Sequence, residues 1–406
     1  MPLPRFRNMD VIPIEEEGKP IFIIQDNEGL FDHTLRLPPM AFVVASLLDG
    51  VREIKGIQDT IAEQFEGTVV PEEELKTIVE DLDKNLLLES KRVSDKRNAI
   101  IEEFSRLPNR PSRFAGLSYA KEPDDLRKEL SAFYDAAGGA GQPGTNTESN
   151  AGEVSAIIAP HIDFPRGGIC YTHPYRQISE RSQADLYVIL GVAHVSPPNP
   201  FVVSAKGFET PFGTVKADTE LIEKLSQRIP GCFENEQVHR NEHSAEFQAV
   251  FLKYARPKAD FQVLPILCST FDPHCGGNSP STSGQIEELL QALGEVTKES
   301  GKKICLVGGV DFAHVGPRFG DQIELDQKLI DWMVEEDQKS LDKIVEGNAE
   351  GFWNSVMQDG NRRHVCGLSA TYSLLRLLKG KPGNRLDYGY AADPAGGYVS
   401  YAGLVF

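Results

Sequence analysis

The segment KICLVGGVDFAHVG, residues 303–316, decides the fold class of this chain. Its first half is a short apolar run that ends in glycine, and its second half places an aspartate and a histidine directly after that run. Such a run is too short for a helix and too evenly apolar for a strand with one face in water. It therefore predicts a strand that is buried on both faces of a parallel sheet.

The same pattern recurs in three other places, at VSAIIAP, DLYVILG and FQVLPIL, residues 154–160, 185–191 and 261–267. Helical periodicity predicts helices between and after these runs, at residues 216–229, 244–256, 284–300, 321–335 and 367–379. The sequences RLDYGYAA and YVSYAGLVF near the end of the chain are typical of edge strands. We therefore expect an α/β fold with a central, mostly parallel sheet flanked by helices.

A small separate domain is expected ahead of this sheet, in residues 1–95. Helices are predicted at residues 37–50, 54–65 and 71–90, after a short extended stretch at residues 20–24. This mainly helical pattern fits a winged-helix module and resembles the PqqD-like peptide-recognition domains, although a structural or dimerisation appendage fits equally well.

Residues 96–109 are interpreted as a connector, which makes residues 110–406 the α/β domain. Within that domain a helix is predicted at residues 121–137. The Gly/Ser/Asn-rich residues 138–153 are predicted to form a flexible loop.

The composition of the 406-residue chain excludes several classes of function. A net charge of -18 argues against binding to nucleic acid or to an anionic membrane, both of which need a basic face. The first residues show no signal-peptide pattern, and no apolar run is long enough to cross a bilayer. Six cysteines spread from residue 170 to residue 366 match no disulfide framework, so we expect reduced thiols and a cytoplasmic protein.

Chemistry-bearing residues follow the predicted strands. His161, His194 and His314 each come directly after a buried run, and ligand sites in open α/β folds lie beyond the carboxyl ends of the strands. One histidine in such a place is more often a hydrogen-bonded cap. Three of them, together with Cys366 at the start of a predicted helix, indicate a shared site. A helix start with nearby basic residues favours the thiolate of Cys366, although a buried inert thiol is the alternative.

A second cluster lies in HRNEHSAE, residues 239–246. Glu242 and Glu246 are one helical turn apart and share a face. Glu242 and His243 could support the site by orienting a ligand histidine through its second ring nitrogen. The same residues could equally cap the helix that begins here.

Seven ordered motifs and the opening of the domain, residues 110–130, resemble the Memo family, including the bacterial and archaeal members called AmmeMemoRadiSam system protein B. The motifs are APHIDFPRGG, LGVAHVSPP, ETPFGTVKAD, NEHSAEFQ, VDFAHVG, HVCGLSAT and YVSYAGLVF, which begin at residues 159, 190, 209, 241, 310, 364 and 398. The resemblance covers nearly all of residues 110–406.

The resemblance implies a fold like that of the class III extradiol dioxygenases, which hold nonhaem iron. It places the metal ligands at His161, His194 and Cys366, and an aspartate and a catalytic acid/base histidine at Asp311 and His314. A cysteine as third ligand departs from the dioxygenase pattern, which has a carboxylate there, and this puts ring cleavage in doubt. Asp163, two residues after a ligand, is expected either to add a carboxylate to the pocket or to face solvent.

Two imidazoles and a thiolate suit Fe(II), Cu or Zn, and the ligands alone do not choose among these metals. The resemblance favours Fe(II) and a redox enzyme that acts on a small molecule or a modified peptide, in a pathway with a radical SAM partner. The competing interpretation is a non-enzymatic metal-binding or adaptor protein. A hydrolytic zinc enzyme is a third possibility.

Overall fold

The structure is a computed structural model that describes residues 2–16, 18–26, 28–31, 33–65, 69–144 and 152–406. The chain divides into two compact units, Met1–Arg106 and Leu107–Phe406. Part of the predicted loop at residues 138–153, namely residues 145–151, lies outside the described residues. Within the described ranges, no helix has both the length and the apolar character needed to cross a membrane.

The first unit combines a three-stranded antiparallel sheet with helices. Its elements are β1 (Asp10–Glu16), β2 (Lys19–Gln25), β3 (Leu35–Leu37), α1 (Pro39–Leu47), α2 (Ile54–Gln64), α3 (Glu72–Lys84) and α4 (Lys91–Arg106). The helices α1 to α3 and the strand β2 fall where the sequence predicts a helix or a strand, whereas β1 and β3 were not predicted. Leu75, Val79 and Leu82 face the core because their spacing places them on one side of α3. The helix α4 covers most of the segment that was interpreted as a connector.

The second unit is built on an 11-stranded sheet, counted over the described residues. Its strand order is β12–β14–β5–β11–β6–β10–β9–β8–β4, with β13 paired to β14 and β7 paired to β10. The strands are β4 (Asn109–Arg110), β5 (Ala156–Ala159), β6 (Leu186–Val192), β7 (Phe201–Val203), β8 (Gly207–Thr210), β9 (Gly213–Ala217), β10 (Gln262–Cys268), β11 (Ile304–Gly309), β12 (His314–Val315), β13 (Asn384–Asp393) and β14 (Gly397–Val405).

The centre of this sheet is parallel. The strands β5, β11, β6 and β10 correspond to the four apolar runs of the sequence, and they pair in parallel in that spatial order. Residues such as Ile158 and Val188 face one core, and their neighbours Ile157 and Ile189 face another. The strands are evenly apolar because both of their faces are covered.

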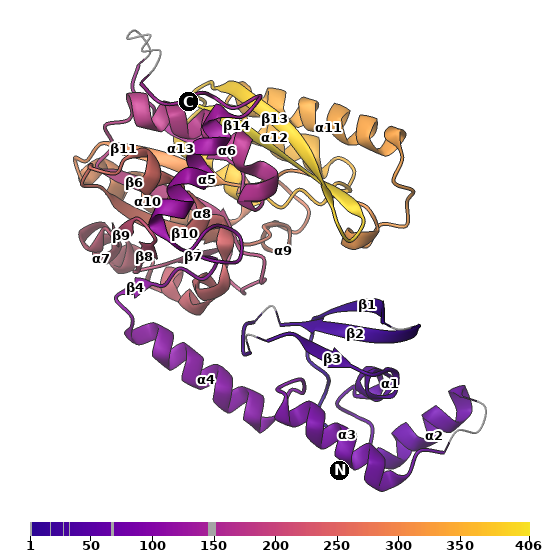
Figure 1. Ribbon diagram of the computed structural model, residues 1–406. Helices are drawn as coiled ribbons and strands as arrows, with labels where there is room; N and C mark the ends of the chain where they lie inside the picture. Colours follow the sequence, from indigo (N-terminus) through magenta and orange to yellow (C-terminus); the bar gives the residue numbers. More distant parts are fainter. Residues whose placement is uncertain (1, 17, 27, 32, 66–68, 145–151) are drawn as a thin grey trace. The chain divides into compact units, whose positions relative to one another are not determined.

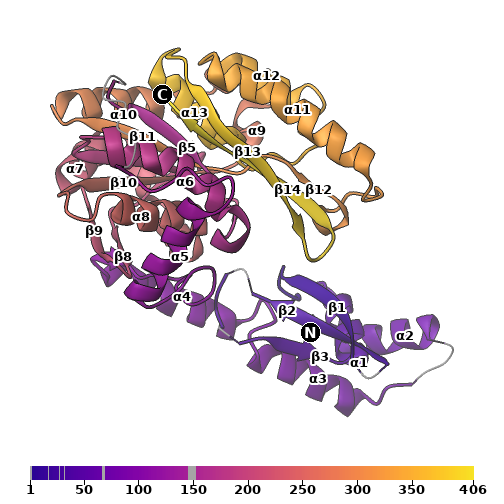
Figure 2. The same ribbon diagram turned by 45° about the horizontal axis from the view of Figure 1, so that its top comes forward.

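Helices form a layer on each face of the sheet (Figures 1 and 2). One layer contains α5 (Pro123–Asp135), α6 (Phe164–Arg181) and α8 (His243–Ala255). The other contains α7 (Thr219–Arg228), α10 (Gly284–Glu299), α11 (Gln327–Val345), α12 (Ala349–Met357) and α13 (Leu368–Leu378). The predicted α/β fold with a mostly parallel sheet flanked by helices is therefore confirmed.

Some predicted elements differ from the structure. The C-terminal strand β14 was predicted at an edge, but it lies inside the sheet, because β13 pairs along one side of it and β12 and β5 pair along the other. The predicted helix at residues 321–335 begins later, at Gln327, because the Asp326 carboxylate accepts a hydrogen bond from Leu329 N at 2.9 Å and fixes the helix start there.

Candidate metal centre

His161 lies two residues after the end of β5, and hydrogen bonds hold both its backbone and its ring. Its backbone N–H donates to Asp311 Oδ1 at 2.9 Å, and its Nδ1 lies 3.0 Å from the carbonyl oxygen of Gly309. Because a carbonyl can only accept, Nδ1 carries the proton and Nε2 keeps a lone pair for a ligand bond. Burial lowers the pKa of His161 to about 3, so the ring is neutral near pH 7.

His194 lies two residues after the end of β6. Its ring is also held at Nδ1, by the Glu242 carboxylate instead of a backbone carbonyl. Its Nδ1 lies 3.0 and 3.1 Å from the two oxygens of Glu242, and its backbone N–H donates to Glu242 Oε2 at 3.0 Å. Burial lowers the pKa of His194, but the Glu242 carboxylate and Cys366 outweigh it and raise this pKa well above its usual range. A metal ion bound at Nε2 would take the place of the second proton.

Cys366 is the residue before Gly367, which caps the N-terminus of α13. Its Sγ lies 3.4 Å from His161 Nε2 and 3.6 Å from the carbonyl oxygen of Asp311. Burial raises the pKa of the Cys366 thiol, so the thiolate needs a cation beside it, and a bound metal supplies that charge.

The loop that presents Cys366 is anchored by a buried ion pair. Arg363 donates to the Asp337 carboxylate on α11, and its second terminal nitrogen donates to Ser340 Oγ at 2.9 Å. The carbonyl of Arg363 accepts a hydrogen bond from His314 N at 2.7 Å. The same residue thus positions the cysteine loop and the backbone of His314.

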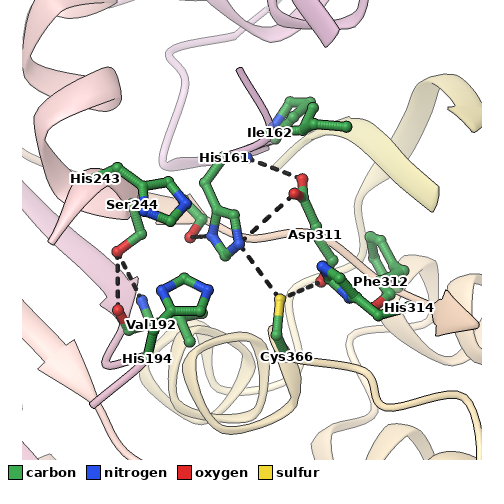
Figure 3. A network of polar contacts seen from close by, with 12 residues as sticks. His161, Ile162, Val192, His194, His243, Ser244, Asp311, Phe312, His314 and Cys366 are labelled. Atoms are coloured by element: carbon green, nitrogen blue, oxygen red, sulfur yellow. Dashed lines mark hydrogen bonds and ion pairs between the residues drawn. The ribbon is translucent and has the colours of Figure 1, made fainter. Parts of the chain in front are cut away.

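The donor atoms of His161, His194 and Cys366 converge. They lie within 4.8 Å of one another, and Figure 3 shows the two rings and the sulfur around a common point. Typical Zn–N and Zn–S distances of about 2.0–2.3 Å bring the ligand atoms of one ion to this order of separation. A second group, His194, Glu242 and His243, meets the same distance criterion. Glu242 is less available, because its oxygens already accept hydrogen bonds from the backbone of His194 and Ser244.

Glu242 and His243 lie at the start of α8, beside the His194 ring. The His243 ring stacks on that of His194 with centroids 4.7 Å apart, and it lies 5.1 Å from the ring of His161. Burial raises the pKa of Glu242, but His194 outweighs it and lowers this pKa well below its usual range, so the carboxylate is charged. Glu242 therefore orients His194 and increases its basicity, as carboxylates behind metal-bound histidines do.

Glycines allow α8 to approach the sheet closely enough for these contacts. A Cβ at Gly191 would lie 2.6 Å from Ser244 Oγ, and one at Gly309 would lie 2.5 Å from the Ser244 carbonyl oxygen. In the space left by these glycines, Ser244 Oγ exchanges hydrogen bonds of 3.0 Å with the backbone of Val192. This contact fixes the start of α8 against the end of β6 and places Glu242 behind His194.

We expect Glu242→Gln to lower metal affinity by about 10–100-fold, because the amide keeps the shape of the carboxylate but not its charge. Competition against a chromophoric chelator would measure this. The matched control is Glu220→Gln, on the exposed side of α7, which should bind metal as the wild type does. Unchanged affinity in Glu242→Gln would contradict the orienting role.

Asp311 and His314 follow β11, on the other side of His161. Asp311 Oδ2 lies 3.6 Å from His161 Nε2, and burial raises the pKa of Asp311 to about 6. His314 Nδ1 lies 3.1 Å from the carbonyl oxygen of Phe312, so its Nε2 is the proton acceptor. Burial lowers the pKa of His314 and outweighs the nearby Asp311 carboxylate. Asp311 thus positions His161 through one hydrogen bond, which its Oδ1 accepts from the His161 backbone N–H at 2.9 Å.

Asp163 was predicted near the site and has other partners in the structure. Its carboxylate caps α6 by accepting from Arg166 N at 3.1 Å, and it forms an ion pair of 2.6 Å with the Arg166 guanidinium. The cap explains why α6 begins at Phe164.

A buried ion pair that was not predicted from the sequence, between Arg110 and Glu246, holds the start of α8 in place. Arg110 Nη1 lies 2.6 Å from Glu246 Oε2, and both side chains are almost fully buried. Arg110 Nη2 donates to the carbonyl oxygen of Glu242 at 2.7 Å. Glu246 also accepts from the backbone N–H groups of Arg113 and Phe114. Glu242 and Glu246 share a helix, but one faces the histidines and the other ties the first residues of the unit to α8.

A cavity of about 400 Å³ adjoins the donor atoms. His194 and Cys366 line one part of it, and Trp353, Met357 and Asp272 line other parts. This is the size range of small-molecule sites. The sequence contains no motif for this cavity. Asp272, however, follows the predicted strand at residues 261–267, so the search for polar residues after predicted strands, which identified the histidines, could also have identified Asp272.

Comparison with known proteins identifies relatives of the whole chain. The family described as Memo-like protein matches residues 110–405. A MEMO1 family protein of Aquifex aeolicus is 29% identical over 410 residues and covers 99% of both chains. A relative in Thermus thermophilus is 27% identical, over 83% of this chain and 93% of its own length. A relative in Desulfurococcus amylolyticus is 26% identical over 96% of its length but 72% of this chain, which therefore carries a region that this relative does not match.

Proposed function

Because the chain belongs to the Memo family, we propose that it is a metal-dependent oxidoreductase with Fe(II) held by His161, His194 and Cys366. The observation that carries the proposal is the convergence of these three donor atoms beside a cavity of about 400 Å³. A ligand set of three protein atoms leaves coordination positions for water or substrate, and the cavity gives a substrate access to them.

The donor set fits such a metal. Each histidine has its Nδ1 engaged, by Gly309 O in one case and by Glu242 in the other, so both rings offer Nε2. Imidazole suits Fe, Cu and Zn alike, and the thiolate adds a soft ligand. Fe(II) is our proposal among these three metals. The described ligands are also compatible with copper and zinc.

When bound, the metal would supply a Lewis-acidic, redox-active position beside the cavity. The protein groups would handle protons and orientation. The lowered pKa keeps the His314 ring neutral near pH 7, so its Nε2 would be free to accept a proton from a bound substrate. Asp311 would keep His161 in place through its backbone bond. Glu242 would keep the His194 ring in place through its contact with Nδ1.

The substrate in this proposal is a small molecule or a modified peptide. The first unit, with its own sheet and core, would bind a peptide or a partner protein, and a radical SAM protein would be a partner in the same pathway. The alternative is an adaptor protein that binds metal without catalysis. The cavity favours the enzyme, because His194 and Cys366 line it and a substrate in it would lie beside the metal ligands.

Oxygen uptake distinguishes the redox enzyme from the non-catalytic adaptor. We expect the protein loaded with Fe(II) to consume oxygen in the presence of ascorbate faster than the protein loaded with Zn(II). His161→Ala, mixed with the same amount of iron, serves as the control for free metal. Equal rates of oxygen consumption for the iron and zinc forms would contradict the redox proposal. They would favour an adaptor protein or a hydrolytic zinc enzyme.

A further inference from the structure

The fourth parallel strand, β10, also leads to a residue at the metal-centre edge of the sheet. β10 pairs in parallel with β6, and Cys268 at its end lies opposite Val192. The segment after β10 therefore emerges beside the segment that carries His194. It ends at Asp272, the first residue of α9 (Asp272–Cys275). β5, β6 and β11 lead to the histidines and Asp311, and β10 leads to this carboxylate.

Asp272 lines the same cavity as His194 and Cys366. Its Oδ1 is buried and has no hydrogen-bond partner among the residues that the structure describes. A buried carboxylate oxygen without a donor is costly, so such atoms in native proteins usually have a water, an ion or a ligand as partner. Asp272 is itself part of the cavity wall, so a ligand in the cavity lies beside this carboxylate.

The charged residues that line the cavity indicate which class of ligand it binds. Asp272 is the acidic residue among the described residues that line the cavity, and these include no lysine or arginine. Besides His194, the cavity wall contains His364, whose Nε2 lies 3.0 Å from Asp321 Oδ1. Met357 adds apolar surface, and the almost fully buried Trp353 adds a small part of it. A negative group beside apolar surface favours a cation with an apolar body.

We infer that the cavity binds a small organic amine, with its ammonium group at Asp272 and its reacting part at the metal centre. The inference rests on the proposed function, because it assigns this cavity as the substrate site of that centre. The ammonium donates to the Asp272 carboxylate, and the apolar body of the molecule packs against Trp353 and Met357. The cavity volume of about 400 Å³ limits the substrate to a molecule of one or two small rings or a comparable chain.

The test uses two probes of nearly equal shape, 2-phenylethylamine and 2-phenylethanol, and the protein loaded with Zn(II), which is redox-silent. Titration calorimetry gives both dissociation constants. We expect the amine to bind about tenfold more tightly or better, because it forms an ionic hydrogen bond with Asp272 where the alcohol forms a neutral one. Asp272→Asn should remove this preference. Asp342→Asn, an exposed position on α11, should keep it.

Three results would overturn the inference: equal binding of the two probes, no binding of either, or a preference that survives in Asp272→Asn. The last result would mean that the amine binds the metal directly. Repeating the titrations on metal-free protein separates this inference from the proposed function. A preference that depends on Asp272 in the metal-free protein would support the amine site whether or not the metal-dependent function holds, and equal binding of the two probes there as well would overturn the amine site alone.

Discussion

His161→Ala and Cys366→Ser should each abolish stoichiometric metal binding. Each substitution removes one of three protein ligands, and serine in place of cysteine exchanges a thiolate for a hydroxyl that stays protonated near neutral pH. The loss should exceed the roughly 10–100-fold expected when only an orienting partner is removed, as in Glu242→Gln. Elemental analysis after anaerobic purification, followed by chelator competition with Fe(II), Cu and Zn, would measure it.

Two controls separate ligand loss from damage to the fold. Cys232→Ser changes a buried cysteine of the same unit that is not part of the donor cluster. His33→Ala changes an exposed histidine of the first unit. Both should bind metal as the wild type does. A wild-type protein that cannot be loaded with any of the three metals would contradict the metal centre itself, and so would a Cys366→Ser variant with full occupancy.

Glu246→Gln should be among the most destabilising substitutions that preserve side-chain shape. It leaves the buried Arg110 guanidinium without its counter-charge, and it weakens the acceptor for the N–H groups of Arg113 and Phe114. Breaking a buried ion pair in this way costs about 3–5 kcal/mol. Urea unfolding followed by the fluorescence of the tryptophans, both of which lie in the second unit, would measure the free energy.

A double-mutant cycle tests whether the ion pair is the cause. Arg110→Met should destabilise the wild-type protein strongly. The same substitution should destabilise the Glu246→Gln variant much less, because in that variant the Arg110 guanidinium has already lost its counter-charge. Glu220→Gln, which breaks the exposed pair with Lys224, should change stability by no more than about 0.5 kcal/mol. Additive effects of the two buried substitutions would contradict the coupling.

The parallel core of the fold could be predicted because burial on two faces leaves a strong mark on the sequence. The strands β5, β6, β10 and β11 are continuous apolar runs for this reason. The helix α6 was not predicted, because its sequence contains Gly167, Gly168 and Pro174, which usually indicate breaks. Tertiary packing overrides that local preference: Gly168 lies against the ring of Phe133, and Pro174 is buried.

The site could be predicted in part. The two donor histidines follow strands whose ends meet at one edge, so their proximity follows from topology. The orientation of their rings does not, because it depends on partners far away in the sequence. Gly309 O fixes the His161 ring, and this contact has no local pattern. Glu242 fixes the His194 ring, which is one of the two roles that the sequence left open for Glu242, but the sequence did not indicate which histidine it would orient. Arg110 was missed because an arginine at the start of a domain ordinarily faces solvent.

The position of β14 affects how a nascent chain can fold on the ribosome. Leu404 pairs with Ile158 of β5, and the strands β6, β10 and β11 are all synthesised between these two residues. One edge of β5 consequently stays unpaired until the last strand has left the exit tunnel. A sheet edge exposed for that long can pair with neighbouring nascent chains, so the second unit should depend on chaperones during synthesis and complete its folding only after translation of residues 397–405.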